Sequence, residues 1–292
     1  MARLSKQAFE EIYKALGPGL QAENALDPVR RALVSKDPHL CKRAGKAIEE
    51  LGLTGLEDQI LEAYDALFGK ADPGCLAKVA LAQALDFMDC EEPAPFLRGV
   101  THVQQEGPGP TNDAGAGLRI RCGLALVRLR RPDVLVFMAD LLADPVPRVR
   151  AGAAGALAYH GDEAGAALLR LKLNLGDAET EVQLEVLKAY LDLDNERGLL
   201  AAESMLLSPK GSDEDVVMAL GESRLPGAFP LLQKWTQTAI GERSVNLAVL
   251  ALLTLRTTES LAYVQELANG NEEMLARVAK QLFEEIIGPI ES

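Results

Sequence analysis

Aromatic residues are scarce in this chain. They make up 4% of its 292 residues, with a single tryptophan. Strands favour β-branched and aromatic residues, whereas alanine, leucine and other small or aliphatic residues suit helices that approach closely. Hydrophobic residues still make up 48% of the chain, which is ample for a buried core. The composition therefore predicts an all-α protein.

Long hydrophobic runs are also missing. The most apolar run, residues 247–255, is far short of the ~20 residues needed to span a bilayer. Residues 1–11 have no apolar segment typical of a signal peptide, so we expect a cytoplasmic protein. The net charge of −13 repels nucleic-acid backbones and anionic membranes unless a basic patch intervenes. We expect neither as a partner.

Residues that carry chemistry are few and dispersed. The four cysteines form no CxxC pair, and we favour small buried hydrophobes over a metal or redox site: Cys41, Cys75, Cys90 and Cys122. None of the three histidines precedes glutamate or lies four residues from another histidine. The HExxH, GxSxG, GxxxxGK[ST] and GxGxxG motifs do not occur. We therefore predict no catalytic residues, no metal site and no cofactor.

What the chain does have is a repeated segment. After Asp144, an apolar residue follows five positions later, a small pair nine and ten later, and an apolar residue thirteen later. The same spacing follows Asp72, Asp113 and Asp177, and the four starts lie 41, 31 and 33 residues apart. In place of the small pair, the first copy has Leu81 and Ala82, and the last has Val186 and Leu187. A pattern with this period predicts stacked supersecondary units.

Second helices with apolar stripes fall between the repeated segments, giving eight predicted pairs. Outer helices should begin near residues 24, 55, 92, 132, 162, 196, 226 and 258. Inner helices should begin near residues 38, 73, 114, 145, 178, 213, 243 and 271. A further helix, Ser5 to Leu16, should stop at the Gly17-Pro18-Gly19 turn. Asp or Asn in most of the turns before inner helices is typical of a helix cap. The predicted caps are Asp37, Asp72, Asp144, Asp177, Asp213 and Asn271.

The repeat resembles the HEAT-repeat family, especially its short bacterial HEAT-like variant, the type found in phycobilisome (PBS) lyases. The resemblance rests on Asp144, Val149-Arg150 and Gly155-Ala156-Leu157, with moderate matches at Leu118-Arg119 and Ala77-Lys78. It covers about residues 20 to 290. It implies a right-handed α-α superhelix, an armadillo-like solenoid of about eight helix pairs. Residues 1–19 would form an N-terminal capping helix, and residues 20–292 a single repeat domain.

The densest basic stretch runs from Arg119 to Arg150, with seven basic and three acidic residues. One interpretation is structural: the resemblance implies that Arg119 and Arg150 pair with the turn aspartate of a neighbouring repeat, while cations near a helix C-terminus meet its dipole. The other is a binding surface for an acidic partner. For that surface the candidate residues are Arg121, Arg128, Arg148 and Tyr159.

Three further features leave alternatives open. The insertion at 104–113 is either a rim loop that carries specificity or a plain flexible segment, and residues 208–212 form a smaller candidate. Gly152 and Gly155 each cost about 1 kcal/mol inside a helix. We favour close helix packing as their explanation over room for a partner.

Because the repeats carry no catalytic motif, we expect a monomeric protein-interaction scaffold or adaptor, not an enzyme, that binds another protein on a concave face. The first alternative is a HEAT-like lyase or isomerase acting on a protein-bound chromophore. The second is a HEAT-like DNA-binding protein, which would need a basic concave face and aromatic side chains.

Overall fold

The computed structural model describes residues 4–69, 71–109, 112–207 and 213–288. These residues contain seventeen α-helices and no strand, so the predicted all-α class is confirmed for them. The chain divides into two compact units, Met1–Ala156 and Leu157–Ser292. This division does not test the prediction of one repeat domain over residues 20–292. No helix among the described residues is long and apolar enough to cross a membrane.

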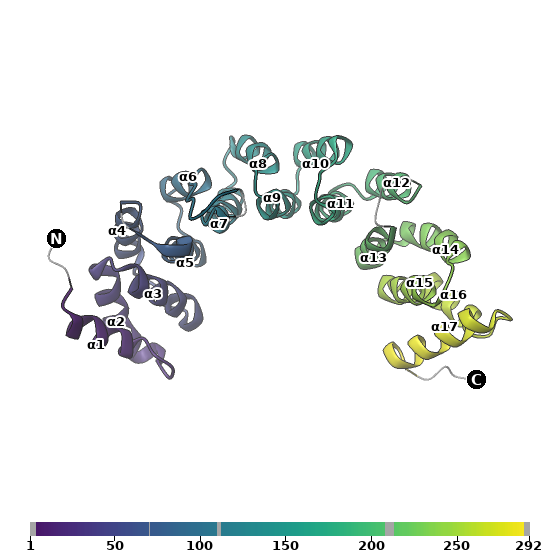
Figure 1. The fold of residues 1–292 in the computed structure, drawn as a ribbon, viewed down its shortest axis with the longest axis horizontal. Helices are drawn as coiled ribbons and strands as arrows, with labels where there is room; N and C mark the ends of the chain where they lie inside the picture. Colours follow the sequence, from purple (N-terminus) through teal and green to yellow (C-terminus); the bar gives the residue numbers. More distant parts are fainter. Residues whose placement is uncertain (1–3, 70, 110–111, 208–212, 289–292) are drawn as a thin grey trace. The chain divides into compact units, whose positions relative to one another are not determined.

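The helices of the first unit follow one another along the chain (Figure 1), with the longest connection between α6 and α7. They are α1 (Lys6–Ala15), α2 (Ala22–Ser35), α3 (Pro38–Leu51), α4 (Glu57–Leu67), α5 (Leu76–Phe87), α6 (Ala94–Val100), α7 (Ala116–Arg128), α8 (Val134–Leu142) and α9 (Pro147–His160), the last containing the boundary between the units. A short 3-10 segment, η1 (Pro73–Cys75), precedes α5.

The second unit continues in the same manner. Its helices are α10 (Glu163–Leu175), α11 (Thr180–Leu193), α12 (Asn195–Leu206), α13 (Asp213–Ser223), α14 (Phe229–Thr238), α15 (Glu242–Leu255), α16 (Thr258–Ala268) and α17 (Glu273–Ile286), with a 3-10 segment η3 (Pro226–Ala228) before α14. All sixteen predicted helix starts lie within three residues of observed ones, because capping residues and apolar periodicity mark helix ends locally.

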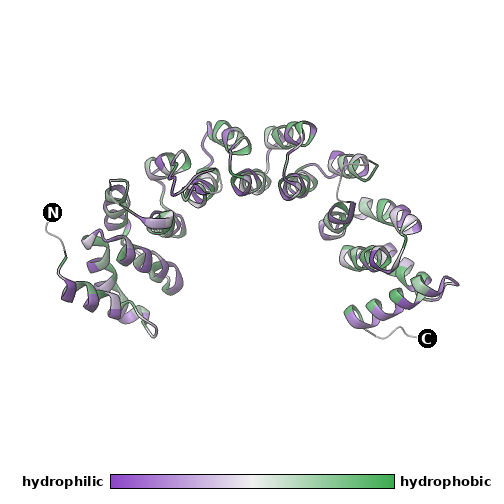
Figure 2. Ribbon diagram, in the orientation of Figure 1, coloured by the Kyte–Doolittle hydropathy of each residue, from purple (hydrophilic) through white to green (hydrophobic). Residues whose placement is uncertain are grey.

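Helices form two rows within each unit (Figure 1). In the first unit α3, α5 and α7 pack in succession, and α2, α4 and α6 pack beside them. In the second unit α11, α13, α15 and α17 pack in succession, with the even-numbered helices against them. We call the odd-numbered helices of a unit its odd row. Hydrophobic residues lie mainly on the sides that face neighbouring helices (Figure 2). Leu81, Leu126, Leu220 and Leu252 are fully buried there.

The turn aspartates cap the inner helices in two ways. Asp37 accepts hydrogen bonds from the amides of His39 and Leu40 at 3.0 and 3.2 Å, as predicted for a cap beside proline. Asp72 is separated from α5 by η1. The carboxylate of Asp72 accepts hydrogen bonds from the amides of Ala77 and Lys78 in the first turn of α5, both at 3.0 Å.

Three predicted caps in the second unit are wrong. Asp177 lies two residues before Glu179, the residue that precedes α11. Asp213 is the first residue of α13, and the cap of α17 is Glu272, one residue after Asn271. Glu272 makes no side-chain cap hydrogen bond, so a polar cap does not fix the start of α17. Helix ends identified from a single polar residue are the least certain part of a pattern.

Candidate functional site

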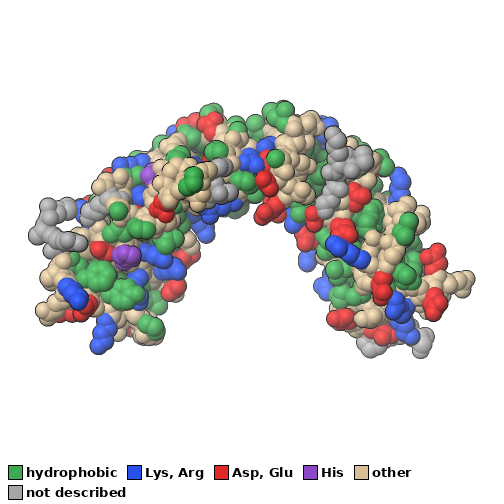
Figure 3. All heavy atoms as spheres, viewed as in Figure 1, with side chains coloured by type: hydrophobic (Ala, Val, Ile, Leu, Met, Phe, Trp, Pro, Cys, Tyr) green, Lys and Arg blue, Asp and Glu red, His purple; other side chains and the backbone are tan. Residues whose placement is uncertain are grey.

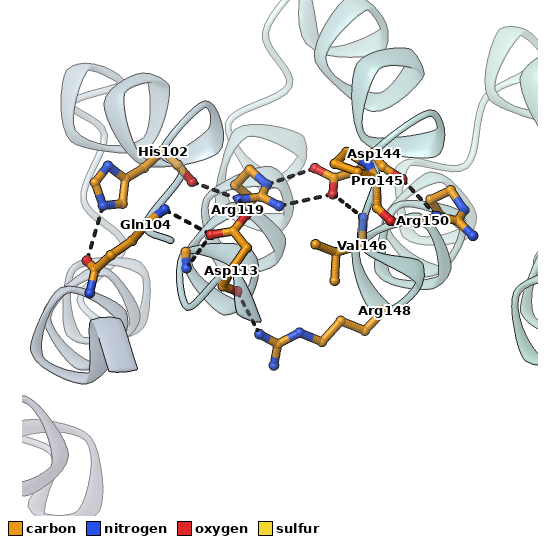
Figure 4. A network of polar contacts seen from close by, with 10 residues as sticks. His102, Gln104, Asp113, Arg119, Asp144, Pro145, Val146, Arg148 and Arg150 are labelled. Carbon is orange, nitrogen blue, oxygen red and sulfur yellow. Dashed lines mark hydrogen bonds and ion pairs between the residues drawn. The ribbon is translucent and has the colours of Figure 1, made fainter. Parts of the chain in front are cut away.

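The most basic segment of the chain is organised by Arg119 on α7. Its Nε and Nη2 donate to Asp144 at 2.8 and 3.0 Å, and its Nη1 donates to Asp113 at 2.6 Å (Figure 4). The side chain is 2% exposed, and the two aspartates are also buried. Burial alone would lower the pKa of Arg119, but hydrogen bonds to Asp144 and Asp113 raise it above its ordinary value.

This arrangement couples successive turns. Asp113 precedes α7 and Asp144 precedes α9, so one guanidinium joins its own turn to the next one along the chain. The Nη1 of Arg119 also donates to the carbonyl of His102 at 2.8 Å. The predicted pairing of Arg119 with a neighbouring turn aspartate is confirmed. A bidentate guanidinium–carboxylate pair fixes both distance and orientation between the elements it joins.

A second buried cation, Lys78, occupies the position equivalent to Arg119 in the preceding repeat. Lys78 on α5 is 2% exposed and lies 3.3 Å from Asp72, six residues before it, as Arg119 is six residues after Asp113. Its Nζ also donates to Gln104 Oε1 at 2.9 Å, and Gln104 Nε2 donates to the Asp72 carbonyl at 2.7 Å. The backbone amide of Gln104 in turn donates to Asp113 at 2.9 Å. We call these linked residues the polar ladder.

The polar ladder also organises the 104–113 insertion. Ala114 donates to the Gln104 carbonyl at 2.8 Å, and the Glu106 side chain accepts from the amide of Gly74 at 2.7 Å. Gln104 and Glu106, at the start of this loop, are therefore tied to the turn before α5. Positions 110–111 within it, and the smaller candidate 208–212, lie outside the described residues.

The other basic residues of the stretch have separate environments. Arg150 donates to the carbonyls of Asp144 and Pro145 at 2.8 and 3.3 Å. Arg128 ends α7, as predicted, and pairs with Asp86 on α5 at 2.7 Å while donating to the Cys90 carbonyl at 2.9 Å. Arg128 therefore clamps α7 to the end of α5.

Arg148 and Arg121 are the more accessible of the candidate arginines. Arg148 is exposed on α9, and its guanidinium reaches the Asp113 carbonyl at 3.4 Å (Figure 4). Arg121 is half-buried on α7 and forms no ion pair with any described residue. Lys and Arg side chains gather around the place of α7 in the first unit (Figure 3).

Arg121 and Arg128 belong to one partly exposed stripe of α7. Gly117, Arg121, Leu124 and Arg128 follow one another at spacings of four, three and four residues, and each is half-buried. This stripe, with Arg148 and Gly152 of α9, is called the open face of the first unit. Tyr159 is 68% exposed and lies on α9 eleven residues after Arg148. It is past the boundary of the first unit, so the open face is defined without it.

The two glycines of α9 differ. A Cβ at Gly152 would lie 3.0 Å from two carbons of Ile120, so close packing against α7 explains this glycine as predicted. A Cβ at Gly155 would meet no described atom within 4 Å. The packing explanation is therefore wrong for Gly155, because its side of the helix faces open space.

The four cysteines are all buried, which confirms their predicted placement. Burial raises the pKa of Cys75 and of Cys122 to about 12. Burial lowers the pKa of His102, whose Nε2 lies 3.4 Å from Gln104 Oε1. Among the described residues, no group of three His, Cys, Asp or Glu side chains is placed to hold a metal ion.

A groove at the N-terminal end escaped the sequence prediction. It has a volume of about 490 Å³ and lies between α3 and the segment joining α1 to α2. Its lining includes His39, Lys42, Arg43 and Lys46, which share one side of α3 because they are spaced at i, i+3, i+4 and i+7. This spacing was the available signal.

Comparison with known proteins gives no relative. No family model matches the sequence, and no curated protein matches it significantly. The HEAT-like resemblance therefore remains a prediction that rests on the repeated residues themselves.

Proposed function

We propose that this chain is a protein-binding scaffold, in which residues 20–292 form a right-handed HEAT-like solenoid of about eight helix pairs behind an N-terminal capping helix. Two-row packing inside each unit supports this proposal. The position of Lys78 and Arg119, each six residues after a turn aspartate, supports it further. The proposed partner is another protein, bound by a cytoplasmic monomer.

The observation that carries the proposal is the contrast between Arg119 and Arg121. Arg119 is buried with its charge matched by two aspartates, and this is the position that the repeats share. Arg121 lies two residues later, on the open face, and has no ion pair among the described residues. A half-buried guanidinium without a carboxylate partner has donors to offer to a bound protein.

The odd row of the second unit makes the contrast clearer. There, charges on successive helices pair with each other: Lys188 with Glu222 at 3.0 Å, Glu214 with Arg243 at 2.6 Å, and Glu242 with Arg277 at 2.8 Å. Residues 157–292 also hold most of the acidic excess, with 11 basic and 22 acidic side chains, against 19 and 21 in residues 1–156. We therefore place the binding surface on the open face of the first unit.

Charge reversal on the open face tests the proposal. The double variant Arg121→Glu/Arg148→Glu leaves the structural pair of Arg128 intact. We expect immobilised wild-type protein to capture from native lysate a protein that this variant does not capture, as measured by quantitative mass spectrometry. The control Lys6→Glu/Arg30→Glu makes the same charge change on α1 and α2, where both side chains are exposed.

Two outcomes would contradict the proposed function. One is identical capture by the wild type and the Arg121→Glu/Arg148→Glu variant at equal thermal stability. The other is binding of labelled duplex DNA that depends on the same two arginines, which would favour the DNA-binding alternative.

A further inference from the structure

The groove at the N-terminal end is formed by two segments distant from the open face. One wall is α3, and the other is the connection from Leu16 to Leu20 together with Tyr13 of α1. Its volume of about 490 Å³ lies within the ~300–1,000 Å³ typical of ligand sites. Polar and apolar side chains line it together.

Arg43 holds the two walls together. Its Nη2 donates to the Leu16 carbonyl, and its guanidinium lies 4.1 Å from the centre of the Tyr13 ring. Its Nε is buried and has no hydrogen-bond partner among the described residues. Arg43 thus holds α3 to the segment that forms the other wall of the groove. Its Nε is enclosed by protein and is not a donor open to a ligand in the groove.

Lys42 and Lys46 add positive charge to the α3 side of the groove. Both line the groove, and neither forms an ion pair with any described residue. Glu50 is the one acidic side chain among the lining residues, and His39 adds a further donor at the mouth. Three permanent cations therefore face one carboxylate, so the local charge favours an anionic ligand.

The apolar side chains that line the groove indicate which kind of anionic ligand it can bind. Leu16, Leu20, Ala47 and Leu51 line the same groove as the lysines. A free inorganic anion would use only the cations, whereas a peptide can place carboxylates on the lysines and an apolar side chain between the leucines. We propose that this groove binds an acidic peptide segment of a partner protein, with Lys42 and Lys46 pairing its carboxylates.

A nucleic acid fits the groove less well. Stacking of bases needs exposed aromatic faces, and one face of Tyr13 is already covered by Arg43. Residues 1–156 carry 19 basic and 21 acidic side chains, so the unit lacks the extended positive field that draws in a polyanion. The groove and the open face are separate sites, and this inference does not depend on the function proposed for the open face.

Selection from a random-peptide library displayed on phage tests the inference with the full chain as bait. Selection on the wild type, with counter-selection on Lys42→Glu/Lys46→Glu, should enrich peptides that carry several Asp or Glu residues around an apolar residue. A fluorescein-labelled synthetic copy of the leading peptide should bind the wild type with an affinity that falls as salt rises, as measured by fluorescence anisotropy.

The variants then locate the site. Lys42→Glu/Lys46→Glu should weaken binding of that peptide by at least about tenfold, since two charge pairs become repulsive. Lys6→Glu/Arg30→Glu, the same charge change outside the groove, should alter it less than about twofold. Both variants should melt near the wild-type temperature, which separates lost binding from lost folding.

Three results would overturn the inference: no peptide that distinguishes the wild type from the groove variant, selected peptides without acidic enrichment, or equal weakening by both double variants. Tighter binding of a labelled oligothymidylate than of the leading peptide, lost in the groove variant, would reassign the groove to single-stranded nucleic acid. Capture by the open face can succeed or fail independently of all these results.

Discussion

Arg119 binds both carboxylate oxygens of Asp144, a residue 25 positions later in the sequence. The Nε and Nη2 atoms of Arg119 donate these hydrogen bonds at 2.8 and 3.0 Å. Asp144 also accepts from the amide of Val146 at 2.8 Å, at the start of α9. The same carboxylate therefore serves the turn before α9 and the guanidinium of α7. This double use explains why an aspartate, and not merely any capping residue, stands at this position.

Removal of the guanidinium should be strongly destabilising. Arg119→Met leaves Asp113 and Asp144 buried without their cation, and breaking a buried pair by removing one partner costs roughly 3–5 kcal/mol. Urea unfolding followed by circular dichroism measures this loss. Arg131→Met is the matched control: its pair with Asp133 is local, lies at the surface, and should contribute little. Equal effects of the two substitutions would contradict a structural role for the polar ladder.

Acid should weaken the polar ladder in a defined pH window. Burial raises the pKa of Asp113, but hydrogen bonds from Gln104, Arg119 and Gly115 outweigh this and hold the pKa below its ordinary value of 3.8. The unfolded chain then takes up the proton first as pH falls. The stability that Asp113 contributes should be complete above about pH 4 and should disappear as the pH falls through the lowered pKa. In the Asp113→Asn variant this part of the acid transition should be missing.

A second pH effect should come from His102, at milder acidity. Burial lowers its pKa below the ordinary 6.5, so the folded protein binds this proton more weakly than the unfolded chain. Stability should therefore fall as the pH drops below about 6.5. Urea unfolding at about pH 7.5 and about pH 5 measures the slope, and His102→Gln should reduce it. An unchanged slope in this variant would show that other groups are responsible.

The sequence predicted the parts of the fold that are local. Helix starts follow from capping residues and apolar spacing, and the burial of the four cysteines follows from their small apolar side chains. The coupling of Arg119 to a neighbouring turn was implied by the HEAT-like resemblance. What the pattern could not supply was the partner of each remaining arginine. Arg128 pairs with Asp86, 42 residues earlier, only because α7 packs against α5.

The candidate sites were predictable to a smaller degree. Arg121 and Arg148 were identified from charge density, which cannot separate them from the buried Arg119 two residues away. The N-terminal groove was missed, although His39, Lys42, Arg43 and Lys46 have helical spacing. The spacing gives a basic side of α3, but a groove exists only because residues 16–20 fold back over that side.

The thiols should be inert in the folded protein. Burial raises the pKa of Cys75 and Cys122 to about 12, which lowers the reactive thiolate by about a thousandfold relative to a free cysteine. Iodoacetamide at about pH 8 should label both residues only after unfolding in guanidinium chloride, as read by peptide mass mapping. Rapid labelling of either thiol in the folded state would contradict their burial.

Gly155 and Gly152 provide a matched pair for testing what each glycine of α9 does. Gly155→Ala adds a methyl group into open space and removes a helix-interior glycine, so it should raise the free energy of unfolding by about 0.5–1 kcal/mol. Gly152→Ala places the same methyl 3.0 Å from Ile120, so contact with α7 should cancel or reverse this gain. Urea unfolding of the two variants measures the difference. A stabilised Gly155→Ala variant that has lost partner capture would show that the glycine is kept for a bound protein, because folding alone favours alanine there. Destabilisation by Gly155→Ala would instead mean that this side of α9 is packed.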